Sequence, residues 1–195
     1  MRHGNLLVIS GPSGAGKGTL VARLLARIPD AWVAVSVTTR KPRPKEVEGQ
    51  HYFFVSDEDF DTLIAEDGLL EWAQVHGARY GTPRALVAQH VAQGEQVILE
   101  IDVQGAFQVR ETMPNAKLIF IEPPSLAALQ TRLRRRGTET PDVIEKRMQV
   151  AQLELSRKME YDVALVNDNL DQASDVLCAL VDSFAEQKQE EEPTL

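Results

Sequence analysis

Short apolar runs alternate with segments of helical period along most of the chain. Four runs are typical of buried parallel strands: Leu6–Ile9, Val97–Ile101, Leu118–Ile121 and Val163–Val166. Trp32–Val37 is a candidate fifth strand. Three other segments repeat apolar residues every three or four positions, which predicts helices with one face in the core. These residues are Leu20, Leu24, Leu25 and Ile28; Ile144, Met148, Ala151, Leu155 and Met159; and Ala173, Val176, Leu177, Leu180, Val181 and Phe184. The alternation predicts an α/β fold, with a parallel sheet flanked by helices on both faces.

Two polar stretches interrupt this alternation. Residues 36–90 are rich in Thr, Pro, Gly, charged and aromatic residues, which predicts an inserted subdomain. Residues 134–142 form a charged connection that we interpret as a short lid. We therefore predict one domain over residues 5–185, with its core at about 5–35 and 91–185, followed by an acidic tail at 186–195. In open α/β sheets, ligands bind beyond the carboxyl ends of the strands, where such insertions emerge.

Composition excludes several classes of protein. The 195 residues are 43% hydrophobic and 26% charged, which is the balance of a globular protein. The net charge of −8 argues against nucleic-acid binding, and the apolar runs are too short for a signal peptide or a membrane span. A single cysteine, Cys178, excludes an internal disulfide and a zinc site built on several thiolates. We expect a cytoplasmic protein, without a nucleic-acid or membrane partner, that is a monomer or a small homo-oligomer.

The most specific local pattern is a glycine-rich loop between the first predicted strand and the first predicted helix. It consists of Gly11, Pro12, Ser13, Gly14, Ala15, Gly16, Lys17, Gly18 and Thr19. Glycines let backbone N–H groups surround phosphate oxygens, and the N-terminus of the helix adds partial positive charge. Lys17 adds a full charge near the β- and γ-phosphates. The pattern predicts a P-loop that binds a nucleoside triphosphate.

One position departs from the usual P-loop pattern, which has Ser or Thr directly after the lysine to bind Mg²⁺. Here Gly18 follows Lys17, and Thr19 comes one residue later. Either the Thr19 hydroxyl binds the metal from a shifted position or water takes its place, and the sequence leaves both open.

Positive charge is concentrated in two clusters despite the acidic total. One consists of Arg40, Lys41, Arg43 and Lys45, and the other of Arg132, Arg134, Arg135 and Arg136. A charge run is usually a solvated surface. Beside a donor-phosphate loop, however, two such clusters favour a reaction that joins two anionic molecules, because guanidinium groups pair bidentately with phosphate.

Several further segments, in order along the chain, resemble the guanylate kinases. They are Ser36–Arg43, Glu46–Gly49, Tyr52–Val55, Leu70–Ala73, Tyr80–Thr82, Leu99–Gly105, Phe120–Ser125, Arg136–Thr140 and Val166–Asp168. The resemblance covers about residues 5–185. It implies a P-loop kinase fold whose insertion binds GMP, and an enzyme of purine nucleotide metabolism. Such an enzyme transfers the γ-phosphoryl group of MgATP directly to GMP, with dGMP as a second candidate acceptor, and yields ADP and GDP.

The same resemblance implies roles for individual residues. The catalytic cations are Lys17, Arg40, Arg132, Arg136 and Arg147, and Asn167 lies near the ATP base together with the P-loop residues 11–19. The GMP phosphate is bound by Arg40, Arg43, Tyr52 and Tyr80, with Glu46 also at the GMP site, and guanine is bound by Ser36, Glu71, Thr82 and Asp102. Thr19 and Glu100 lie near Mg²⁺, directly or through water. Glu100 stands where the family usually has Asp, which lengthens that side chain by one methylene.

The chemistry of guanine independently favours a carboxylate reader. Guanine offers N1–H and N2–H₂ as donors, whereas adenine offers an unprotonated N1, so Glu71 suits guanine and a Ser36 or Thr82 hydroxyl suits its O6. Taken alone, Glu71 is better interpreted as an exposed helix carboxylate, but the nearby Trp72 and Tyr80 oppose that interpretation. The acceptor phosphate is already anionic at neutral pH, so the reaction needs no general base, and we assign none of the four histidines a role.

Two other interpretations compete with this one. The first is another small-molecule P-loop kinase, acting on AMP or on a phosphorylated ribose. The second is a guanylate-kinase-like scaffold module that binds phosphorylated partners without turnover. Such modules typically lose the P-loop lysine or glycines, whereas this chain keeps Lys17 and four loop glycines.

Overall fold

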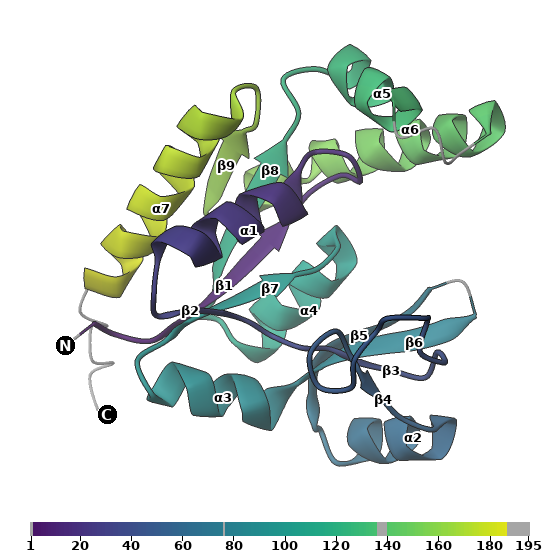
Figure 1. The fold of residues 1–195 in the computed structure, drawn as a ribbon, viewed down its shortest axis with the longest axis vertical. Helices are drawn as coiled ribbons and strands as arrows, with labels where there is room; N and C mark the ends of the chain where they lie inside the picture. Colours follow the sequence, from purple (N-terminus) through teal and green to yellow (C-terminus); the bar gives the residue numbers. More distant parts are fainter. Residues whose placement is uncertain (1, 76, 136–139, 187–195) are drawn as a thin grey trace.

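A five-stranded parallel sheet forms the centre of the molecule in the computed structural model, which describes residues 2–75, 77–135 and 140–186 (Figure 1). Its strands lie in the order β2-β7-β1-β8-β9. They are β1 (Asn5–Ser10), β2 (Ala31–Val33), β7 (Gln96–Glu100), β8 (Lys117–Glu122) and β9 (Val163–Val166). The four apolar runs predicted as strands therefore form β1, β7, β8 and β9, and the predicted parallel sheet is confirmed.

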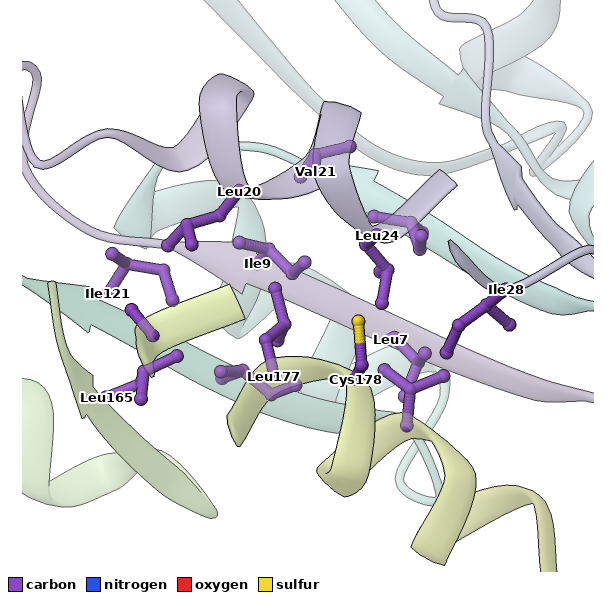
Figure 2. Packing of buried hydrophobic residues seen from close by; sticks show 14 of the residues in the cluster. Leu7, Ile9, Leu20, Val21, Leu24, Ile28, Ile121, Leu165, Leu177 and Cys178 are labelled. Atoms are coloured by element: carbon purple, nitrogen blue, oxygen red, sulfur yellow. The ribbon is translucent and has the colours of Figure 1, made fainter. Parts of the chain in front are cut away.

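Helices cover both faces of this sheet, because its buried strands present apolar side chains alternately to either side. On β1, Leu7 and Ile9 face α1 (Lys17–Arg27) and α7 (Leu170–Glu186), and Figure 2 shows how Leu20, Leu24 and Leu177 pack against them. Leu6 and Val8 point the other way, toward α3 (Arg84–Ala92) and α4 (Val103–Thr112). The remaining helices are α5 (Leu126–Arg135), α6 (Pro141–Ser156) and the short 3₁₀ helix η1 (Lys158–Glu160).

Three residues of the predicted helix stripes are not in the core. Met159 is 84% exposed, because α6 ends at Ser156 and the following 3₁₀ turn no longer continues its buried face. Leu25 and Val176 are 39% and 47% exposed at the margins of their helices' buried faces. The expectation that these positions face the core was wrong.

A second, four-stranded sheet lies beside the first (lower right in Figure 1). It has the order β4-β3-β6-β5 and is built from β3 (Val37–Thr38), β4 (Phe53–Phe54), β5 (Leu69–Val75) and β6 (Ala78–Pro83). The helix α2 (Asp57–Ala65) packs its buried Phe60 against Val37 and Leu69 of this sheet. A Ser56–Asp59 capping box starts α2.

The predicted strand Trp32–Val37 was wrong as a single element. β2 ends at Val33, and Val37 begins β3 in the other sheet, so residues 34–36 carry the chain from one sheet to the other. The segment expected to be a lid, 134–142, lies partly outside the described residues, and the expected acidic tail at 186–195 lies almost wholly outside them. Within the described part of the chain, no helix is both long and apolar enough to cross a membrane.

Adjacent leucines on α1 provide a test of this packing. Leu24 is fully buried between β1 and α7, whereas Leu25 is 39% exposed. We expect Leu24→Ala to lower the free energy of unfolding by about 2–5 kcal/mol, because it opens a cavity in the core. Leu25→Ala should lower it by less than about 1 kcal/mol. Urea denaturation of both variants measures this difference, and equal losses would contradict the assignment of the buried face.

Candidate active site

The P-loop follows the central strand β1 and leads into α1. Gly11 (φ 134°) passes so close to β8 that an added Cβ would lie 2.1 Å from the Ile121 carbonyl oxygen. Gly16 precedes α1 with φ 98°, and a Cβ there would lie 2.4 Å from the Asn167 amide nitrogen. These two positions therefore require glycine, because both the left-handed conformation and the close approach exclude a side chain.

The loop surrounds a polar hollow of about 400 Å³, whose lining includes Glu100. The lining residues are Ser13, Gly14, Gly16, Lys17, Gly18, Thr19 and Glu100. The Lys17 ammonium donates to the Gly11 and Pro12 carbonyl oxygens at 2.6 and 3.3 Å, so it is held against the loop. The first turn of α1 contains no acidic residue, which leaves its positive dipole end uncompensated by carboxylates of that turn. A lysine beside a helix N-terminus is an arrangement that suits an anionic ligand.

Three side chains that are distant in sequence brace the P-loop, two of them through its backbone and one through the Ser13 hydroxyl. The buried Asn167 amide donates to the Ala15 carbonyl oxygen at 2.8 Å, and Arg132 donates to the Ala15 and Asn167 carbonyl oxygens at 3.3 and 2.8 Å. Arg147 donates to the Ser13 hydroxyl at 2.7 Å. The structure thus brings Asn167, Arg132 and Arg147 to the loop. Arg136, the remaining predicted catalytic arginine, lies outside the described residues.

Glu100 ends β7 beside the P-loop, because β7 pairs with β1 at Ile9 and Glu100. An added Cβ on Gly18 would lie 3.4 and 3.5 Å from the two Glu100 carboxylate oxygens, so the carboxylate faces the start of α1. The Thr19 hydroxyl and the Glu100 carboxylate are the oxygen donors near the start of α1 in the lining of the hollow. This composition fits Mg²⁺, which is commonly held by one or two carboxylates together with substrate phosphates and water.

A second cationic group lies on the second sheet. Arg40 donates to both carboxylate oxygens of Glu46 at 2.7 and 2.9 Å and to the Tyr80 hydroxyl at 3.3 Å. Its guanidinium also lies over the Tyr52 ring, 5.1 Å from the centroid, and the Tyr52 and Tyr80 rings meet edge to face. The Arg43 backbone N–H donates to Glu46 at 2.6 Å. Glu46 therefore orders the loop that carries both arginines.

These contacts shift the pKa values of the pair in opposite directions. Hydrogen bonds from Arg40, followed by the Arg43 N–H, lower the pKa of Glu46 to about 2. The Glu46 carboxylate in turn raises the pKa of Arg40 above its ordinary value. Both groups are therefore charged throughout the neutral range.

A buried carboxylate lies at the junction of the two sheets. Glu71 on β5 is 7% exposed and accepts a hydrogen bond from the buried Thr82 hydroxyl of β6 at 2.6 Å. Ser36 directly precedes the Val37–Gly81 pair and Thr82 follows it, so Ser36 and Thr82 are also neighbours across β3 and β6. Asp102 caps α4 by accepting from the Gly105 N–H at 2.8 Å. Burial raises the pKa of Glu71 to about 7, with the nearby Asp102 charge adding to the shift and the Thr82 hydrogen bond opposing it.

A further acidic group near the P-loop was not predicted from the sequence. Glu154 on α6 is half-buried, and desolvation raises its pKa while the Lys17 charge opposes that shift. Glu154 carries no local motif, because it is one polar position on an otherwise ordinary amphipathic helix.

Comparisons with known proteins agree with this geometry. A family model described as guanylate kinase matches residues 3–184. The guanylate kinase of Streptomyces coelicolor is 54% identical over 175 residues, which cover 90% of this chain and 89% of that protein. The crystal structure of guanylate kinase from Anaplasma phagocytophilum has a TM-score of 0.75 at 33% identity, covering 96% of this chain and 89% of that one. The shikimate kinase of Bacteroides thetaiotaomicron, with a TM-score of 0.53 at 17% identity and coverage of 91% and 98%, shares the fold alone. The predicted kinase fold is confirmed.

The pKa of Glu71 predicts how stability depends on pH. The folded state raises this pKa from 4.5 to about 7, so it binds a proton that the unfolded state releases. Protonated Glu71 contributes about 3 kcal/mol to the free energy of unfolding. This contribution is fully present below pH 4.5 and is lost as the pH rises through 7. We expect the free energy of unfolding of the wild type to fall between pH 5 and 8 relative to that of Glu71→Gln. Urea titrations of both proteins at each pH measure this, and parallel pH profiles would contradict the assignment.

Proposed function

The chain belongs to the guanylate kinase family, and from that premise we propose that it transfers the γ-phosphoryl group of ATP to GMP, yielding ADP and GDP. The observation that carries the proposal is the buried Glu71 carboxylate, which lies on the second sheet while the P-loop lies on the first. In this proposal GMP binds at the second sheet, which carries Glu71, and ATP binds at the P-loop of the first sheet.

Glu71 reads the base in this proposal. Its carboxylate accepts from guanine N1–H and N2–H₂, and adenine, which has a lone pair at N1, would be repelled. The Ser36 hydroxyl, directly before β3, donates to guanine O6, and Asp102 supplies a further acceptor from the start of α4. The Thr82 hydroxyl donates its one hydrogen to Glu71 and so holds the carboxylate in place. Because Glu71 is buried, a base that fails to satisfy it leaves an unpaired polar group, which costs much of the binding energy.

The GMP phosphate is bound by the cationic group that contains Arg40. Arg40, Tyr52 and Tyr80 already contact one another, and Arg43 lies on the loop that Glu46 orders. Glu46 acts here as a positioning residue: it holds the guanidinium and the loop in place before the phosphate arrives. We place the GMP-binding subdomain in the insertion at about residues 36–90, which contains the second sheet and α2.

The triphosphate of ATP occupies the hollow of the P-loop. Lys17 and the backbone N–H groups of residues 11–19, apart from Pro12, bind its phosphates. Asn167, Arg132 and Arg147 keep the loop in its binding conformation. Thr19 and Glu100 would hold the Mg²⁺ that accompanies ATP, which neutralises phosphate charge when bound.

Transfer requires two anions to approach in line, and the acceptor needs no deprotonation. The work of the chain is therefore to neutralise charge and to align the reacting groups. Lys17, Arg40, Arg132, Arg136 and Arg147 are the cations to which we assign this role. No step passes through a covalent intermediate on the protein.

A panel of acceptors tests the proposal. We expect ADP release from ATP to be fast with GMP, measurable with dGMP, and roughly 10⁴-fold less efficient with AMP. Lys17→Met should lower kcat/KM for GMP by roughly three orders of magnitude or more, because it removes a charge at the transferring group.

Lys117→Met is the matched control for this lysine. Lys117 begins β8, at the end of the sheet opposite the P-loop, so its replacement should leave turnover unchanged. A preference for AMP would overturn the base assignment. Binding of GMP without any turnover would favour a scaffold module instead.

A further inference from the structure

A glutamine on α4 is bonded to the backbone of β5 in the way that a neighbouring strand would be. The Trp72 N–H donates to the Gln108 side-chain oxygen at 3.0 Å, and the Gln108 amide donates to the Trp72 carbonyl oxygen at 3.1 Å. Gln108 thus satisfies both backbone polar groups of a single strand residue. The Thr112 hydroxyl, one turn further along, lies 3.2 Å from the Leu70 carbonyl oxygen of the same strand.

These contacts join the two sheets at a defined place. β5 is the edge strand of the second sheet, and β6 covers its other side. α4 packs against the central sheet through Val103, Ala106 and Val109, and it lies between that sheet and β5 in Figure 1. The Gln108–Trp72 pair therefore fixes the register between β5 and a helix that belongs to the other sheet.

The Glu71 carboxylate lies directly beside this contact. Glu71 directly precedes Trp72, and an added Cβ on Gly105 would lie 3.0 Å from a Glu71 carboxylate oxygen. Asp102, Gly105 and Gln108 follow one another at steps of three along α4, so they lie along one side of the helix. One side of α4 thus carries the acidic cap Asp102, Gly105 beside the carboxylate, and Gln108, which is bonded to the strand.

We propose that Gln108 is a positioning residue for guanine recognition, which holds the Glu71 carboxylate in register with Asp102 through the backbone of Trp72. The inference rests on the proposed function, because it deepens the assignment of Glu71 as the reader of the base. Gln108 itself contacts no substrate in this account. Its loss would let β5 shift along or away from α4, and the carboxylate would no longer match the two guanine donors.

Gln108→Leu removes both hydrogen bonds and keeps a good helix former. We expect KM for GMP to rise roughly tenfold, as two hydrogen bonds of ordinary strength would give. KM for ATP and kcat at saturation should change less than about twofold, because the P-loop and the cations are untouched. KM for IMP, which lacks the 2-amino group of guanine, should rise less than KM for GMP. The preference for GMP over IMP should therefore shrink.

Two further variants keep the test decisive. Gln89→Leu makes the same change on an exposed position of α3 and should leave both KM values and the GMP/IMP ratio unchanged. Gln108→Met is an alternative to Gln108→Leu if the latter is poorly folded. Without nucleotide, amide hydrogen exchange at Trp72 should accelerate in both Gln108 variants, which reports the contact independently of turnover.

The possible results separate the two proposals. A wild type that does not use GMP would overturn the proposed function and, with it, the role of Gln108 in reading guanine. A wild type that uses GMP, together with Gln108 variants whose GMP/IMP preference is intact, would overturn the positioning role alone. A kcat that falls equally for GMP and IMP, together with a lower free energy of unfolding, would likewise overturn it. That pattern indicates a purely structural contact.

Discussion

The desolvation of one carboxylate constrains much of this structure. Glu71 is almost fully buried where β5 packs against α4, and burial raises its pKa to about 7. A carboxylate in such a place destabilises the folded chain at neutral pH unless a ligand supplies hydrogen-bond donors. Thr82 supplies one donor, and guanine would supply two more. The cost to the free protein and the selectivity for the base are thus two consequences of the same burial.

The cations follow a complementary rule, since they are held in place before any anion arrives. Arg40 is fixed by Glu46 and Tyr80, and Lys17 by the Gly11 and Pro12 carbonyl oxygens. Preorganised charges need little rearrangement at the moment of transfer, which is how electrostatic catalysis lowers a barrier. A chain with a net charge of −8 can therefore bind two anionic nucleotides, because the charges at the site, and not the total, determine the local potential.

Features encoded by neighbouring residues were the ones that could be predicted from the sequence. The P-loop, four strands and the α/β class depend on short runs, and the structure and the relatives confirm the fold. The split of Trp32–Val37 between two sheets, the exposure of Met159, and the placement of Gln108 and Glu154 were not predicted. Each depends on where an element ends or on a partner far along the chain, such as Trp72 for Gln108. The roles of the individual site residues stay predictions.

The pH dependence of GMP affinity tests the central claim most directly. If the Glu71 carboxylate accepts the guanine donors, its ionised fraction, and with it affinity, rises about tenfold between pH 6 and 8 when its pKa is about 7. Calorimetry should therefore show the wild type gaining roughly tenfold in GMP affinity over Glu71→Gln across this interval. The titration of the GMP phosphate is common to both proteins and cancels in the ratio. A ratio that is the same at pH 6 and pH 8, or equal affinities at pH 8, would contradict the account.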